Sequence, residues 1–131
     1  MVSNYYIKEK EGIILKGVIT CGSKVGYNGK EEIDYEKIVG ILEKSHKSIE
    51  DIGMKPIPCV ISRGELIMKT NKGNYKEKVY FLNFSSSPRF PMDKKTFYNT
   101  LIEYINIIGY VSKQERIYLE FNNKTIVFKI K

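Results

Sequence analysis

The amino-acid sequence predicts an α+β fold, with a single antiparallel sheet of about seven strands and two helices on one face. Two stretches have the apolar spacing of amphipathic helices, and the segments around them alternate apolar and polar residues as half-buried strands do. The order strand, helix, hairpin occurs twice, across residues 13–70 and 77–131. We therefore expect the element order ββαββ followed by βαββ, and the repeated order suggests an internal duplication.

The chain is expected to form one domain over residues 1–131, because no linker or low-complexity segment divides it. No apolar stretch reaches the roughly 18 residues of a membrane span, and the N-terminus lacks the hydrophobic core of a secretion signal. We therefore expect a cytoplasmic protein without membrane contact. A second arrangement stays open at this stage, in which the sheet curls partly into a barrel around one helix.

The first third of the chain predicts a hairpin followed by a loop. Residues 4–9 and 13–20 alternate and are rich in Tyr, Ile and Val, which favours two strands. The short segment between them, Lys10-Glu11-Gly12, suits a tight turn. Residues 21–33 contain several glycines among polar residues and predict a loop.

Two helices are predicted, over residues 34–52 and 93–109. Each begins at an aspartate, whose side chain can accept a hydrogen bond from the first free backbone N–H groups. Each ends at a glycine, which readily takes the left-handed conformation that closes a helix. The bounding residues are Asp34 and Gly53 for the first helix and Asp93 and Gly109 for the second.

The remaining strands are predicted as two hairpins and one single strand. Prolines 88 and 91 make residues 85–91 a loop, because proline cannot donate to a strand ladder. Pro58 indicates either an edge position or a short length for the strand that contains it. The strands are 57–62 and 65–70, joined at Arg63-Gly64, then 77–84, then 116–121 and 124–130, joined at Asn122-Asn123.

The face of the sheet opposite the helices is the first candidate binding surface. Strand alternation places tyrosines, basic residues and a few aliphatic residues there. Single-stranded nucleic acid fits such a face, since bases stack on tyrosine and cations hold phosphates; a protein partner, a second copy of the chain, or a merely solvated face fits it too. The predicted binding residues are Tyr6, Lys8, Lys16, Lys69, Tyr80, Arg116, Tyr118 and Lys129, with Lys78, Ile14, Ile67, Leu82 and Val127 among them.

The two loops that lead into the helices are the second candidate surface. Hydroxyl groups and cations beside a helix N-terminus can bind an anion, although ordinary turn and capping chemistry explains the same residues. Neither loop matches a P-loop or a dinucleotide-binding fingerprint. The predicted anion-binding residues are Ser23, Lys24 and Lys30 in the first loop and Ser86, Ser87 and Arg89 in the second.

The residues that carry catalysis in most enzymes are scarce. His46 is the single histidine and borders the apolar stripe of the first helix, while Cys21 and Cys59 form no motif. We therefore expect no catalytic residues, no metal and no cofactor. With a formal net charge of +7, the sequence favours a non-enzymatic protein that binds nucleic acid. The alternative is a phage or mobile-element protein that inhibits a host protein or sequesters a nucleotide.

Overall fold

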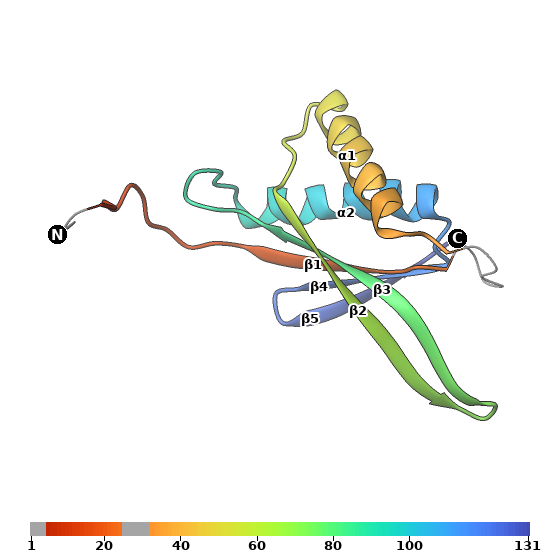
Figure 1. Ribbon diagram of the computed structural model, residues 1–131. Helices are drawn as coiled ribbons and strands as arrows, with labels where there is room; N and C mark the ends of the chain where they lie inside the picture. Colours follow the sequence, from red (N-terminus) through yellow and green to blue (C-terminus); the bar gives the residue numbers. More distant parts are fainter. Residues whose placement is uncertain (1–4, 25–31) are drawn as a thin grey trace.

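The computed structural model describes residues 5–24 and 32–131 and confirms the predicted α+β class (Figure 1). A single antiparallel sheet carries two helices, and within the described residues it has five strands, not about seven. The elements are β1 (Lys16–Gly22), α1 (Tyr35–Asp51), β2 (Cys59–Thr70), β3 (Gly73–Ser85), α2 (Lys94–Ser112), β4 (Arg116–Phe121) and β5 (Lys124–Lys129).

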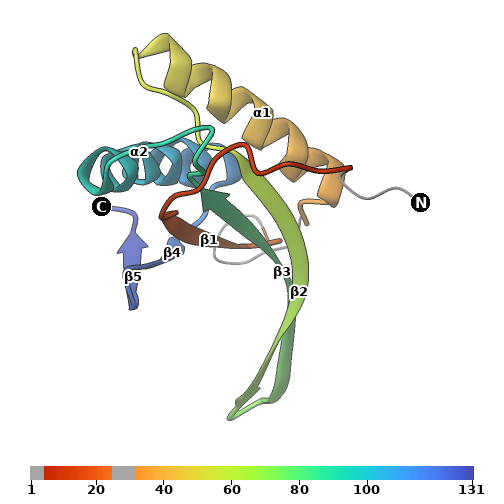
Figure 2. The ribbon, with the colours of Figure 1, turned by 90° about the vertical axis from the view of Figure 1, so that its left-hand side faces the viewer.

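The strand order β2-β3-β1-β4-β5 interleaves two β–α–β units. One unit joins β1 to β2 through α1 with β3 between them, and the other joins β3 to β4 through α2 with β1 between them. This is the split β–α–β arrangement of ferredoxin-like folds, extended by β5. The two units run in opposite directions, so two crossovers of the same hand leave both helices on one face. Figures 1 and 2 show both helices on the same side of the sheet, as predicted.

The core lies between the helices and the helix-side residues of the three central strands. Ile19, Leu82 and Leu119 come from neighbouring strands and are fully buried. The predicted stripes of the helices cover them, and Phe97 and Leu101 of α2 are equally inaccessible. The capping aspartates are confirmed, because Asp34 accepts from the backbone of Lys37 and Asp93 from that of Thr96. Neither described helix has the length and hydrophobicity needed to cross a membrane.

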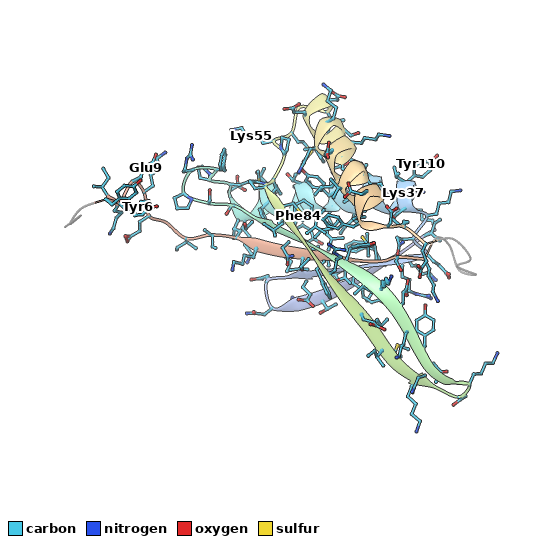
Figure 3. All side chains as sticks on the ribbon, viewed as in Figure 1. Tyr6, Glu9, Lys37, Lys55, Phe84 and Tyr110 are labelled. Carbon is cyan, nitrogen blue, oxygen red and sulfur yellow. The ribbon has the colours of Figure 1, made fainter. Side chains whose placement is uncertain are left out.

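The predicted N-terminal hairpin is wrong. Within residues 5–24 only Lys16–Gly22 forms a strand, and residues 5–15 run away from the sheet as an extended arm (Figure 1). The predicted hairpin would need a free edge of β1. Because β3 and β4 pair with both edges of β1, the arm cannot pair with that strand. Figure 3 shows Tyr6 and Glu9 on this arm, at a distance from Phe84 in the core.

The turn predicted at Arg63-Gly64 is also wrong. β2 continues through both residues, Gly64 pairs with Val79, and the chain turns only after Thr70. The glycine serves packing, since a Cβ atom there would lie 2.6 Å from Cε2 of Phe81. Two predicted strands therefore merge into one, which together with the missing N-terminal strand accounts for the lower strand count.

Helix ends and the last turn agree only in part with the sequence. Gly53 takes the expected left-handed conformation after α1, with φ of 82°. α2 continues through Gly109 to Ser112, and Lys113 takes the left-handed position instead. The tight turn between β4 and β5 is confirmed, with φ of 55° at Asn122 and 62° at Asn123.

The buried hydroxyl of Tyr104 links the two helices and the segment that follows α1. It accepts a hydrogen bond from the backbone N–H of Ile57 at 3.1 Å. Its own proton is donated to Nδ1 of His46, 2.6 Å away, in the tautomer of the neutral imidazole that carries its proton on Nε2. Burial lowers the pKa of His46 from its ordinary value of 6.5, although Glu43 opposes the shift. The folded protein thus favours the neutral imidazole that accepts this hydrogen bond.

We predict that the two turn asparagines are required in their left-handed conformation. Asn122→Ala and Asn123→Ala should each lower the free energy of unfolding by about 0.5–1 kcal/mol, whereas glycine at either position should cost nothing. Urea denaturation measures these values. Asn106→Ala, at an exposed helical position, is the control and should not destabilise. Equal tolerance of alanine at all three positions would contradict the turn geometry.

We also predict that stability falls as His46 becomes protonated. Because the folded state lowers the pKa of His46, its contribution is complete above the unfolded value of about 6.5 and is lost as the pH falls below it. Urea denaturation between about pH 7.5 and pH 5 should show this loss in the parent protein. His46→Gln, which retains an acceptor but does not titrate, should show a smaller loss. The same pH dependence in both proteins would rule out this role.

Candidate functional site

A cleft of about 480 Å³ lies where α1 begins above the β2–β3 ribbon. Three short segments line it: residues 32–35, which enter α1, residues 63–65 of β2, and residues 78–80 of β3. Figures 1 and 2 show the ribbon continuing past the rest of the sheet, away from both helices. The cleft thus marks the place where helical cover of the sheet stops.

Strand length and alternation explain the charged lining of the cleft. β2 and β3 have 12 and 13 residues, but β1 beside them has only 7. In the register of the ribbon, Arg63 is opposite Tyr80 and Glu65 is opposite Lys78. These four side chains share the face on which Leu82 is buried, so they extend the helix side of the sheet beyond the apolar core.

Tyr80 fixes the segment that leads into α1. Its hydroxyl donates a hydrogen bond to the carbonyl oxygen of Ile33 at 2.7 Å, and the residue is buried. Burial raises the pKa of Tyr80, and the nearby carboxylate of Asp34 raises it further, while Arg63 opposes the shift. The hydroxyl therefore stays protonated and acts as a donor that positions the backbone.

Arg63 lies over the aromatic ring of Tyr35, with Cζ 4.3 Å from the ring centroid. Tyr35 is the first residue of α1 and follows the capping residue Asp34. This stacking joins the start of the helix to β2 across the cleft, and it holds the guanidinium group in a defined place.

The cleft contains both signs of charge, with an excess of negative charge. Three carboxylates and two cations line it, so the net charge of the lining at neutral pH is −1. Among the residues that the structure describes, none of these five groups forms an ion pair. The groups are Glu32, Asp34, Glu65, Arg63 and Lys78. Such a site suits a ligand that carries separate positive and negative groups.

The first predicted anion-binding loop begins beside this cleft. Ser23 is buried and its backbone bonds to Lys78 and Ile33, while its hydroxyl has no hydrogen-bond partner among the described residues. Lys24 lies over the ring of Tyr75, 4.6 Å from its centroid. Lys30 lies outside the described residues.

The residues of the second predicted loop lie at the other end of β3. The Ser86 hydroxyl accepts from the backbone of Leu15 and the Ser87 hydroxyl from that of Phe90. Arg89 lies over Phe90, with Cζ 5.7 Å from the ring centroid. These contacts give both serines a structural role, since Ser86 holds the end of the arm at Leu15 and Ser87 stabilises a turn. The binding of an anion here stays a prediction.

The face away from the helices contains four of the eight predicted binding residues. The pairing of the strands places Lys16, Arg116, Tyr118 and Lys129 there together. The placement of Tyr80 and Lys69 is wrong, because both lie on the helix side of the ribbon. Tyr6 and Lys8 belong to the arm. That this face meets a protein partner or a second copy of the chain stays a prediction.

The cleft was not predicted from the sequence because apolar residues occupy both faces of β3. Val79 and Phe81 alternate with Tyr80, Leu82 and Phe84, so the pattern does not say which set faces the helices. Arg63 was predicted to lie in a turn, so it was not included among the predicted binding residues. The glycine that follows it was a usable signal, since glycine within a strand often marks close packing as well as a turn.

The described residues offer neither a cluster of metal ligands nor a reactive cysteine. No group of three or more His, Cys, Asp or Glu side chains in residues 5–24 and 32–131 could hold a metal ion. Burial raises the pKa of the Cys21 thiol to about 12, with a further contribution from Cys59, and burial raises the pKa of Cys59 to about 12 as well. Both thiols are therefore protonated at neutral pH and poor nucleophiles.

No protein-family model and no curated protein matches the sequence. Solved structures do match the fold. One, described as a phage SAM lyase in complex with S-methyl-5'-thioadenosine, aligns over 95% of this chain and 96% of its own, with a TM-score of 0.68 and 11% identity. A phage SAM lyase in the apo state aligns over 96% of this chain and 98% of its own, with a TM-score of 0.69 and 11% identity. The chain therefore has the fold of these lyases.

These matches contradict the function expected from the sequence. Both neighbours are enzymes, so the expectation of a non-enzymatic protein that binds nucleic acid is wrong. The alternative expectation, an inhibitor or sequestering protein of a phage or mobile element, agrees with the neighbours only in their phage origin. The tyrosine and lysine pattern misled because a partly exposed antiparallel sheet carries such residues without any ligand.

The hydrogen bond of Tyr80 to Ile33 predicts a measurable stability effect. Tyr80→Phe leaves a buried carbonyl oxygen without its donor and should lower the free energy of unfolding by about 1–2 kcal/mol in urea. Tyr118→Phe is the matched control, because Tyr118 is partly exposed on the other face, and it should change stability by less than about 0.5 kcal/mol. Equal effects of the two substitutions would show that the hydroxyl of Tyr80 does not fix the entry to α1.

Proposed function

We propose that the protein is an enzyme that cleaves S-adenosylmethionine (SAM) in the cleft between α1 and the β2–β3 ribbon, releasing S-methyl-5'-thioadenosine. The observation that carries this proposal is the structural likeness to phage SAM lyase over 95% of the chain. A shared fold alone does not establish a shared activity. The proposal therefore also depends on whether the cleft suits this substrate.

The charges of the cleft complement those of SAM. The substrate has a positive sulfonium, a positive α-ammonium group and a negative α-carboxylate, and thus a net charge of +1. The lining of the cleft has a net charge of −1, with groups of both signs. Its volume of about 480 Å³ falls in the range of small-molecule sites. Tyr35 supplies aromatic surface for the adenosine part.

S-methyl-5'-thioadenosine is what remains of SAM when the bond between sulfur and the amino-acid chain breaks. The electron pair of that bond goes to sulfur, which becomes a neutral thioether. In a lyase reaction the carbon left behind gains its new bond within the same fragment. The bond forms either to its own carboxylate oxygen, closing a ring, or as a carbon–carbon double bond when a neighbouring proton passes to a base, such as a carboxylate of the cleft. Mass spectrometry of the second product distinguishes these two outcomes.

In this proposal the carboxylates of the cleft capture and orient the cationic substrate. Glu65 and Asp34 lie on opposite walls, one on β2 and the other at the cap of α1. Attraction to the sulfonium in the bound substrate does not by itself accelerate cleavage. The gain comes from holding the reacting atoms in a productive arrangement. After cleavage the sulfur is neutral, so the attraction weakens and the product can leave.

The direct test is to incubate the purified protein with SAM and to follow S-methyl-5'-thioadenosine by liquid chromatography with mass spectrometry. SAM also decomposes slowly by itself, so samples without protein and with heat-denatured protein are required. We expect S-methyl-5'-thioadenosine to form in step with the loss of SAM, well above both blanks. Formation at the rate of the blanks would contradict the proposal.

We predict that Glu65→Gln lowers kcat/KM for SAM about 10- to 100-fold, because it removes one charged contact to a cationic substrate. Glu50→Gln makes the same chemical change at an exposed position near the end of α1 and should leave kcat/KM unchanged. Circular dichroism confirms that both variants are folded. Full activity of a folded Glu65→Gln variant would exclude this residue from the site.

A further inference from the structure

The guanidinium group of Arg63 stacks on Tyr35, and attraction between opposite charges does not explain this position. Three carboxylates line the same cleft as Arg63. Yet the ion pairs among the described residues join Lys8 to Glu11, Lys47 to Asp51 and Arg116 to Glu115, and none includes Arg63. The guanidinium is placed by an aromatic ring and not by a carboxylate.

Stacking occupies the flat face of a guanidinium group and leaves its N–H donors, which lie in the plane, available. The ring of Tyr35 is itself well placed. It belongs to the first residue of α1, after the cap at Asp34 and after the backbone that Tyr80 holds through Ile33. Arg63 is therefore a fixed cation at the edge of a cleft, and its N–H donors bond to no other residue that the structure describes. That is the arrangement that receives a carboxylate through two parallel hydrogen bonds.

We propose that Arg63, positioned by Tyr35, binds the α-carboxylate at the amino-acid end of the substrate. This inference rests on the proposed function. It gives the cleft a selectivity: adenosyl compounds with an amino-acid carboxylate are bound through Arg63, and those without one are not. The adenosine part then lies toward the rest of the cleft, so that both ends of the substrate are fixed on either side of the sulfur.

Two related compounds test this directly. S-adenosylhomocysteine keeps the amino-acid end and lacks the reactive sulfonium, whereas S-methyl-5'-thioadenosine lacks the amino-acid end. Isothermal titration calorimetry should show that Arg63→Met weakens binding of S-adenosylhomocysteine about 10- to 100-fold. Binding of S-methyl-5'-thioadenosine should change less than about twofold. Arg63→Lys, which keeps the charge but loses the planar fork, should give an intermediate loss for S-adenosylhomocysteine alone.

The controls separate a carboxylate contact from general effects. Lys44→Met removes a positive charge from the exposed surface of α1 and should change neither affinity. Tyr35→Ser removes the ring and should weaken S-adenosylhomocysteine more than S-methyl-5'-thioadenosine, because it also releases Arg63.

The outcomes distinguish this inference from the proposed function. If Arg63→Met weakens both compounds equally or neither of them, Arg63 does not recognise the carboxylate, even when SAM is cleaved. If the parent protein binds neither compound and forms no S-methyl-5'-thioadenosine from SAM, the proposed function fails and this inference fails with it. Selective loss of S-adenosylhomocysteine in Arg63→Met is the supporting result.

Discussion

The pairing of β2 with β3 determines which side chains can meet in the cleft. The two strands stay in register from Cys59 opposite Phe84 to Thr70 opposite Gly73. A shift of one residue would move every side chain of β2 to the other face. Arg63 and Glu65 would then leave the side of the ribbon that faces α1. The close packing of Phe81 over Gly64 helps to maintain this register, since a side chain at residue 64 would collide with the aromatic ring.

The interleaved topology supplies the other wall of the cleft. Because β3 lies between β1 and β2, the connection through α1 must pass over the sheet, and the start of α1 lies above the point where the ribbon leaves the core. The hydrogen bond from Tyr80 to Ile33 fixes that connection to β3. A rigid core thus ends beside a polar cleft, which is a common position for binding sites in proteins. The phage lyases share this fold at 11% identity, so the packing pattern persists where few individual residues do.

Local chemistry made part of this architecture predictable. The caps at Asp34 and Asp93, the apolar stripes of both helices and the asparagine turn depend on neighbouring residues, and all were visible in the sequence. Gly64 and Gly109 were misassigned, because a glycine can mark a turn, close packing or an ordinary helical position. Tertiary structure makes that choice, and local sequence does not report it.

The cleft itself could not be predicted in the same way. Its walls come from segments around Tyr35, Arg63 and Tyr80, which are 28 and 17 residues apart in the sequence, and they meet only through the strand order. Alternation identified a charged and aromatic set of side chains but assigned Tyr80 to the wrong face. Hydrophobic periodicity describes one segment at a time, so it cannot predict which distant segments lie side by side.

The most direct measurement is an NMR titration of the isotope-labelled protein with S-methyl-5'-thioadenosine. If the cleft binds adenosyl compounds, the backbone amides of residues 33–35, 63–65 and 78–80 should shift together and saturate with one affinity. Shifts confined to other surfaces, such as the groove between α2 and β5 around Ile105 and Phe128, would place the ligand elsewhere. An absence of shifts at saturating ligand would contradict an adenosyl-binding cleft altogether.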